Sequence, residues 1–165
     1  MWVWILWVVV GLLVVALGAF TTLLMAMRTK NRRALLMIRR LGRWGTNHGM
    51  ARSAGEPGSS TALIRHVGRR SGAPYVTPIG VLPMDGEFLV YLPYGPEVDW
   101  LRNVRAAGSA ELRVDGITHT VSPRMVEPAE ALAYLSARER RSTQLFGITD
   151  FLALRRVPVT SGGPL

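Results

Sequence analysis

The segment Gly68–Gly72 has the sequence Gly-Arg-Arg-Ser-Gly and concentrates groups that bind anions. Its glycines permit backbone angles that let successive N–H groups converge on a phosphate. Arg69 and Arg70 add two guanidinium groups, and Ser71 adds a neutral hydroxyl donor. The segment therefore predicts a turn that binds a phosphate or carboxylate group. The alternative is an ordinary surface turn whose polar side chains contact only water.

The composition argues against several other kinds of chemistry. The chain has no cysteine, which excludes disulfides, a thiolate nucleophile and cysteine-based metal sites. His48, His66 and His119 lie far apart in the sequence and lack the spacing of metal ligands, so zinc is not expected. The chain contains neither a P-loop nor a G-x-G-x-x-G pattern, so nothing supports a nucleoside triphosphatase or a Rossmann fold.

Short strands separated by turns are expected from Thr61 onward. The pairs Asp85–Gly86 and Asp115–Gly116 are hairpin signals, because both positions of each pair tolerate a positive φ. Pro78 and Pro83 place the second strand at a sheet edge or at a bulge. The predicted strands are Thr61–Val67, Tyr75–Met84, Glu87–Leu92, Ala110–Val114 and Ile117–Val121.

Two helices are expected between and after these strands. Val98–Ala107 has Asp99 near its beginning and Gly108 at its end. Glu127–Ser142 has apolar residues on one side and a basic tail, whereas the segment Phe146–Val159 is ambiguous. Four or five antiparallel strands with two inserted helices predict a small, barrel-like α+β domain.

The N-terminal segment predicts a membrane-spanning helix. Met1–Met27 has no charged residue, and about 20 apolar residues already cross the hydrocarbon core of a bilayer. A cleaved signal would carry basic residues before a shorter apolar stretch, whereas here they follow it. Because positive charge beside a spanning helix tends to stay in the cytoplasm, we expect a single-pass anchor in the cytoplasmic membrane with the domain facing the cytoplasm. The alternative is a buried core helix.

A basic segment follows this predicted anchor. The net charge of the chain is +9, and a basic run beside a membrane usually contacts anionic lipid. We therefore expect residues 1–43 to contact lipid; nucleic-acid binding is the rival use of such charge, but no nucleic-acid-binding motif supports it. Asn31–Trp44 predicts an amphipathic helix that lies on the membrane or packs on the domain, and Gly49–Ser60 predicts a loop. The basic residues are Arg28, Lys30, Arg32, Arg33, Arg39, Arg40 and Arg43.

Four motifs in order resemble the deazaflavin-dependent nitroreductase and quinone reductase family, which are split-barrel oxidoreductases that use coenzyme F420. They are the Gly68–Gly72 turn, Thr77–Pro78, the Asp85–Gly86 hairpin and the W-x-x-N-V sequence of Trp100–Val104. The resemblance covers about Thr61–Val126 and implies a split antiparallel β-barrel with flanking helices. With the predicted anchor (1–27) and the basic helix and loop that follow it (28–60), the resemblance implies a split-barrel, coenzyme-binding domain over residues 61–165.

The resemblance implies a role for each motif. Arg69, Arg70 and Ser71, with Gly72, would bind the phosphate and acidic tail of the coenzyme. Thr77–Pro78 would lie beside the deazaflavin ring, with the backbone contacting its polar edge.

Trp100 and Asn103 would close the site, with the indole as apolar cover and the amide as a polar contact. The alternatives are a core aromatic for Trp100 and a helix-surface amide for Asn103. Tyr91 and Tyr94 stand where many relatives have Ser or Lys, which makes them candidate ring neighbours or proton donors. Structural packing is the alternative for both tyrosines.

The implied activity is hydride transfer from reduced F420 to an acceptor. The membrane anchor favours a lipophilic acceptor such as a quinone. FMN is the alternative cofactor, and homodimerisation follows by analogy with other split barrels. The competing hypotheses are a non-catalytic, membrane-tethered protein that binds the coenzyme or a hydrophobic ligand, and a structural adaptor that has lost its site.

Overall fold

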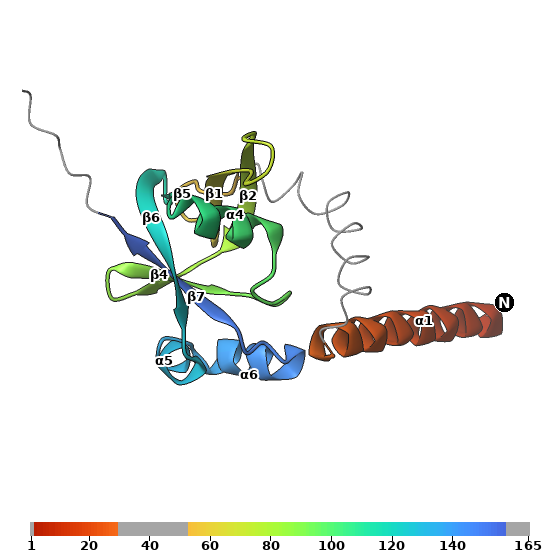
Figure 1. The fold of residues 1–165 in the computed structure, drawn as a ribbon. Coiled ribbons are helices and arrows are strands. Elements are labelled where there is room, and N and C mark those ends of the chain that lie inside the picture. Colours follow the sequence, from red (N-terminus) through yellow and green to blue (C-terminus); the bar gives the residue numbers. More distant parts are fainter. Residues whose placement is uncertain (1, 30–52, 158–165) are drawn as a thin grey trace, which may run out of the picture.

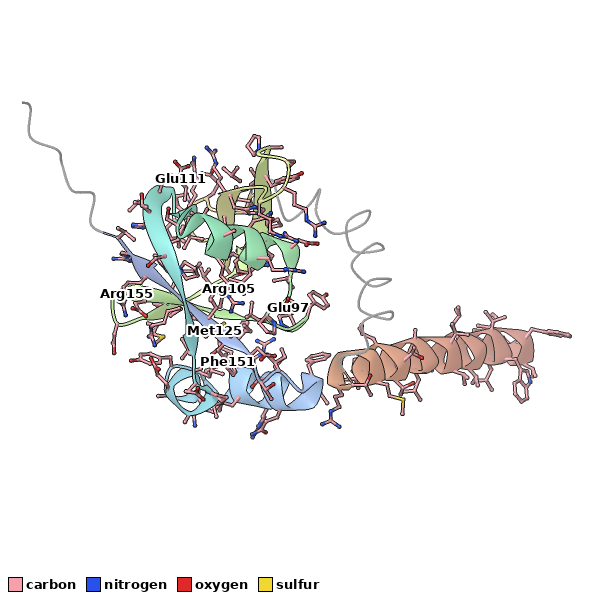
Figure 2. All side chains as sticks on the ribbon, viewed as in Figure 1. Glu97, Arg105, Glu111, Met125, Phe151 and Arg155 are labelled. Carbon is pink, nitrogen blue, oxygen red and sulfur yellow. The ribbon has the colours of Figure 1, made fainter. Side chains whose placement is uncertain are left out.

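The computed structural model describes residues 2–29 and 53–157. The first helix, α1 (Trp2–Arg28), extends away from the rest of the protein and contacts α6 near Arg28 (Figure 1). Most of its apolar side chains are exposed (Figure 2). Within it, Trp2–Met25 has a mean hydropathy of 2.7 and is long and apolar enough to cross a membrane. The predicted helix Asn31–Trp44 lies outside the described residues, and so do residues 49–52 of the predicted loop Gly49–Ser60.

Two polar side chains in the apolar stretch of α1 are satisfied by the helix itself. The hydroxyl groups of Thr21 and Thr22 donate to the carbonyl oxygen of Gly18 at 3.0 and 2.7 Å. Such bonds back to the preceding turn remove the cost of placing a hydroxyl in an apolar environment. The helix is therefore compatible with lipid along its whole apolar length.

Within the described residues 53–157, the chain contains one antiparallel sheet of seven strands, in the order β2-β1-β5-β6-β7-β4-β3. The strands are β1 (Thr61–Val67), β2 (Pro74–Gly80), β3 (Leu82–Met84), β4 (Glu87–Tyr91), β5 (Ala110–Val114), β6 (Ile117–Val126) and β7 (Phe151–Arg156). Helix α4 (Asp99–Ala107) lies beside β1, and α5 (Pro128–Ala133) and α6 (Ala137–Phe146) lie at the other end of the sheet (Figure 1).

The sheet curls until its two ends meet. Strands β2 and β3 lie at opposite ends of the strand order, yet only Val81 separates them in the chain. Because one residue spans only about 3.5 Å, the two edges must lie close together, and β2 indeed contacts β4. This closure confirms the predicted α+β split barrel. It also confirms that the prolines mark edges, because Pro78 lies on β2 and Pro83 on β3.

Both predicted hairpins are confirmed. Asp85 and Asp115 have φ angles of 33° and 49°, and the glycine after each also has a positive φ. These are the angles that a two-residue turn of this type requires. The helix expected over Val98–Ala107 forms as α4, which ends at Gly108 with a φ of 76°.

Other boundaries were predicted wrongly. Seven strands form rather than four or five, because Tyr75–Met84 divides at Val81 and the ambiguous segment contains β7. The predicted strand Ile117–Val121 continues to Val126 as β6.

The predicted helix Glu127–Ser142 is two helices, α5 and α6, so three helices lie in the described part of the domain rather than two. Ser136 starts the second one: its side chain accepts a bond from the backbone of Glu139, and the Glu139 carboxylate accepts one from the backbone of Ser136. This reciprocal cap begins a new helix within the apolar spacing that indicated a single one.

Two apolar cores lie on opposite faces of the sheet. Strands β4 and β7 serve both, since alternate residues point to opposite sides. The first core, inside the curl and under α4, includes Ile64, Phe88, Val90, Leu101, Val104, Leu112, Leu152 and Leu154. The second, which α5 covers, includes Met84, Leu89, Val126, Ala131, Leu135, Phe151 and Ala153.

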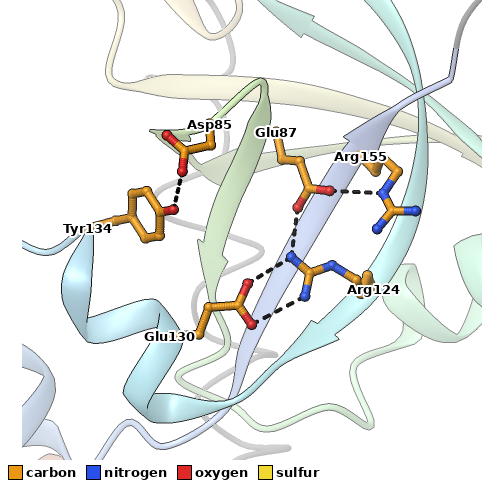
Figure 3. A network of polar contacts seen from close by, with 6 residues as sticks. All are labelled: Asp85, Glu87, Arg124, Glu130, Tyr134 and Arg155. Carbon is orange, nitrogen blue, oxygen red and sulfur yellow. Dashed lines mark hydrogen bonds and ion pairs between the residues drawn. The ribbon is translucent and has the colours of Figure 1, made fainter.

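A network of polar and charged groups joins β4, β6, β7 and α5 with the turn between β3 and β4 (Figure 3). The carboxylate of Glu87 accepts hydrogen bonds at 2.9 Å from both Arg124 and Arg155, and its side chain is 15% exposed. Arg124 also donates to Glu130, and Tyr134 donates to Asp85. Burial raises the pKa of Glu87, but the hydrogen bonds from Arg155 and Arg124 outweigh burial and hold the pKa below its ordinary value.

We expect Glu87→Gln to lower the free energy of unfolding by about 1.5–3 kcal/mol at neutral pH, since two charge-assisted hydrogen bonds are weakened. The depressed pKa means that this stabilisation is present at neutral pH and begins to be lost as the pH falls below the ordinary value of 4.5. Thermal unfolding of the full chain in detergent, followed by circular dichroism at several pH values, measures both effects. Glu130→Gln is the control, because that carboxylate is 41% exposed and should contribute less than about 1 kcal/mol. Equal effects of the two variants would contradict this account.

Candidate functional site

The turn between β1 and β2 is a tight loop with little spare room. The backbone N–H of Gly68 donates to the carbonyl of Ala73, and that of Gly72 donates to the carbonyl of Gly68, both at 2.8 Å. The Ser71 hydroxyl accepts a bond from the backbone of Ala73 at 3.3 Å. A side chain at Gly68 would meet Ser71 Oγ at 2.5 Å and the Tyr75 ring at 2.7 Å. The predicted turn is therefore well defined, and a side chain at its first position would fit only if Ser71 and Tyr75 moved.

The two arginines of this turn have different surroundings. The backbone N–H and Nη1 of Arg69 both donate to Asn103 Oδ1, at 3.2 and 2.8 Å, and Nη2 lies 3.3 Å from Asp99 Oδ1. The Arg69 side chain is consequently only 22% exposed. Arg70 is exposed and has no hydrogen-bond or ion-pair partner among the residues that the structure describes. Arg69 thus fixes the turn to α4, while Arg70 is available to a ligand.

Asn103 has a fixed orientation because its partners differ in kind. Its Oδ1 must face the two N–H donors of Arg69, so its Nδ2 faces His66 Nδ1, at 3.2 Å. His66 Nδ1 is therefore an acceptor, and the proton of the neutral imidazole lies on Nε2. That nitrogen is 3.1 Å from Thr77 Oγ1 and donates to it. A continuous chain of hydrogen bonds links the turn, α4, β1 and β2.

His66 is the member of this chain that the sequence analysis missed as a site residue. It is 7% exposed, and burial lowers the pKa of its imidazole, which favours the neutral form. Its position in the strand could have identified it, because every second residue of β1 is buried: Ala62, Ile64 and His66. A histidine in an inward-pointing series of apolar residues needs polar partners, and Asn103 and Thr77 supply them.

The neighbouring residues Thr77 and Pro78 lie on opposite faces of β2. Thr77 pairs with Ile64 and shares the inner face with His66. Pro78 pairs with Leu63, so it points outward, because successive residues of a strand alternate. Of this predicted pair, only the Thr77 side chain meets the network of Asn103.

Trp100 and Tyr94 lie on the same side of the sheet as this network. Both are half-buried and pack against the first core. Helix α4 holds Trp100 in place because the next residue, Leu101, and Val104 are fully buried. One part of the indole thus packs against the first core, and the other part is exposed on α4.

Tyr91 lies elsewhere. Its ring packs against the second core, and its hydroxyl donates to Glu139 at 3.3 Å. Burial and the Glu139 carboxylate raise the pKa of Tyr91 to about 12. The structure therefore brings Arg69, Ser71, Thr77 and Asn103 together and leaves Tyr91 on the opposite face of β4.

A shallow hollow of about 420 Å³ lies at another place, along Ser53–Thr61. Its one charged lining residue is Glu56, whose carboxylate pairs with Arg113. No cationic residue among those described lines this hollow, so the turn with its two arginines remains the candidate anion site. Among residues 2–29 and 53–157, no group of three His, Asp or Glu side chains could hold a metal ion.

Comparison with solved structures returns distant likenesses. The structure of an F420H2-dependent reductase (FDR-A) has a TM-score of 0.43 and 13% identity, over 58% of this chain and 94% of that one. The heme storage protein HutZ from Vibrio cholerae has a TM-score of 0.44 and 14% identity, over 59% and 82%. A Clostridium acetobutylicum protein related to general stress protein 26 of B. subtilis has a TM-score of 0.45 and 11% identity, over 67% of this chain and 80% of that one. We infer neither function nor assembly from these values.

Comparison with sequence families is more informative. No curated protein matches the chain, but the sequence model of the F420H2-dependent quinone reductases matches residues 39–160. That match spans the Gly68–Gly72 turn, α4 and all strands of the sheet. Because it covers well over half of the chain, the protein belongs to the F420H2-dependent quinone reductase family.

Proposed function

We propose that this protein is a membrane-anchored oxidoreductase that transfers a hydride from reduced coenzyme F420 to a lipophilic acceptor such as a quinone. The family supports F420 as the cofactor and lends no support to FMN. The observation that carries the proposal is the turn itself, where Arg69 is fixed internally and Arg70 faces solvent without a partner among the described residues. A phosphate or carboxylate is the chemical group that such an arrangement suits.

The donor set fits the coenzyme that the family uses. Arg70 and the hydroxyl of Ser71 would bind its phosphate and acidic tail, and both are exposed on the turn. Thr77 would contact the polar edge of the ring, and the half-buried indole of Trp100 would give it apolar cover. Asn103, in contrast, is 6% exposed and bonded to Arg69 and His66, so we assign it the role of holding the turn.

When bound, the reduced coenzyme supplies the hydride, and the protein supplies binding, orientation and exclusion of water. Two-electron reduction of a quinone also takes up a proton on oxygen, so a proton donor is useful. Tyr94 is the tyrosine on the side of Trp100, whereas the Tyr91 hydroxyl is directed to Glu139. We therefore propose Tyr94 as the donor.

The membrane anchor supports the choice of a lipophilic acceptor. The guanidinium of Arg28, at the end of α1, donates to the carbonyl of Gln144 at 3.4 Å, which joins that end of the helix to α6. The domain thus lies at the basic end of α1, where a quinone dissolved in the bilayer would be within reach of a tethered enzyme. Homodimerisation stays a prediction.

The activity is tested by mixing the full chain in lipid nanodiscs with reduced F420 and a short-chain quinone under anaerobic conditions. Protein-dependent oxidation of the coenzyme, followed by its absorbance and fluorescence, is expected. Parallel reactions with nitro and enone acceptors define the acceptor class. Tight binding of F420 without oxidation by any acceptor would replace the enzyme with a non-catalytic binding protein.

The topology gives a further expected result. Because the basic residues follow the apolar helix, a reporter fused after Leu165 should be active only in a form that works in the cytoplasm. A second fusion, before Met1, is the matched control and should report the opposite side. A signal from the C-terminal reporter outside the cytoplasm would contradict the assignment.

A further inference from the structure

The hydrogen-bonded chain under the turn is buried in its middle and more open at its ends. Asn103 and His66 are 6% and 7% exposed. At one end the Arg69 side chain is 22% exposed, and at the other Thr77 is half-buried. The chain therefore connects two partly accessible groups through two buried ones.

The direction of every hydrogen bond in this chain follows from its first member. Arg69 can only donate, so Asn103 accepts with Oδ1 and donates with Nδ2, and His66 accepts with Nδ1. His66 Nε2–H then donates to Thr77 Oγ1. The Thr77 hydroxyl is left with its own hydrogen, which can donate to an acceptor outside the chain.

We propose that His66 is a positioning residue for the coenzyme site: its neutral Nε2–H form holds Asn103 against Arg69 and directs the Thr77 hydroxyl hydrogen toward the bound ligand. This inference rests on the proposed function, because it assumes that the ligand is F420. His66 does not touch the ligand; it acts through Asn103 and Thr77.

Acid reverses one bond of the chain. A second proton on His66 occupies Nδ1, which then faces the Asn103 amide nitrogen as donor to donor at 3.2 Å. Rotation of the amide relieves this conflict only by turning its nitrogen toward the two donors of Arg69. Protonation therefore loosens the turn, and the pKa of His66, which burial lowers, keeps the closed form dominant at neutral pH.

Few other charged or titratable groups reach this imidazole. From β2, the Tyr75 ring stacks on it, with centroids 5.7 Å apart. From the turn and α4, Arg69 and Asp99 reach it only through Asn103. From β5, Glu111 lies opposite Arg65 in the strand register, and Arg65 is on the other face of β1 from His66. A change of affinity with pH that depends on these hydrogen bonds is therefore assigned to protonation of His66.

The test compares F420 affinity of the full chain in nanodiscs between about pH 5 and pH 7.5. Wild type should lose affinity as the pH falls below the pKa of His66, which burial places under the ordinary histidine value of 6.5, and one linked proton changes affinity at most tenfold per pH unit below that point. His66→Gln keeps one acceptor and one donor but does not titrate, so its affinity should change less than about twofold relative to the coenzyme's own titration. His66→Phe keeps a ring stacked on Tyr75 and removes both hydrogen bonds. At either pH its affinity should be about tenfold below that of wild type at pH 7.5.

A readout without coenzyme completes the experiment. Long-range proton–nitrogen NMR spectra of the free protein should show His66 as the Nε2–H tautomer at neutral pH. A Nδ1–H tautomer, or the same pH profile in wild type and His66→Gln while F420 still binds, would overturn the positioning role alone. Failure of wild type to bind F420 at any pH would instead refute the proposed function, and with it the role of His66 toward this coenzyme.

Discussion

Replacing Arg70 with alanine should lower the affinity for F420 about 10- to 100-fold while the melting temperature stays unchanged. Arg70 is exposed and has no partner among the described residues, so its removal breaks no hydrogen bond or ion pair among those residues. A charge-assisted hydrogen bond to a phosphate or carboxylate contributes about 1.5–3 kcal/mol, which corresponds to this loss. Fluorescence titration with F420 and a thermal scan measure the two quantities.

Arg69→Ala should behave differently, because that side chain is part of the structure. Its loss removes the Nη1 donor to the buried Asn103 Oδ1 and the ion pair with Asp99, so both affinity and melting temperature should fall. Arg65→Ala is the matched control, since it removes the same charge from the outward face of β1 and should change neither. Equal losses of affinity in the Arg65 and Arg70 variants would show that only the overall positive charge matters. An unchanged affinity in Arg70→Ala would make the turn an ordinary surface turn.

Tyr94→Phe should lower the rate of quinone reduction about 100-fold, with coenzyme affinity changed less than about threefold. A positioned proton donor contributes typically 10²–10⁴-fold to the rate, and water substitutes for part of it in an open site. Because the donor acts mainly in the transition state, kcat should fall rather than KM rise. Stopped-flow oxidation of pre-bound reduced F420 separates the reduction step from binding.

Tyr91→Phe is the control for this experiment. It removes the same hydroxyl group from the same segment, but from the face of β4 that packs against the second core. We expect an unchanged rate and a loss of stability of about 1 kcal/mol, because the bond to Glu139 is lost. A large loss of rate in Tyr91→Phe with full activity in Tyr94→Phe would reverse the two roles.

The parts of the fold that the sequence predicts are those determined by neighbouring residues. Asp85–Gly86 and Asp115–Gly116 specify their turns through backbone angles alone, and both form. Strand β7 was ambiguous for a physical reason: its first four residues, Phe151–Leu154, are buried on both faces, so the chain shows no apolar and polar alternation. The break at Ser136 had a local signal in the Ser-x-x-Glu sequence, but the apolar spacing on both sides of it indicated one helix.

The candidate site divides in the same way. The turn and the α4 motif are local, and both were predicted as binding elements. The hydrogen bond between Arg69 and Asn103 joins residues 34 positions apart. No local sequence pattern indicates that the Asn103 amide binds Arg69 and His66 rather than a ligand. The same holds for Tyr91 and Tyr94, whose separation onto different cores depends on how β4 is buried from both sides.

The strand order has a consequence for how the chain is made. Strand β7 follows the other six strands in the chain but lies between β6 and β4. During synthesis from the N-terminus, β6 and β4 each present an unpaired edge until β7 leaves the ribosome, and unpaired edges invite association with other chains. A nascent chain stalled before Phe151 should therefore aggregate or recruit chaperones, whereas one released after Arg156 should not.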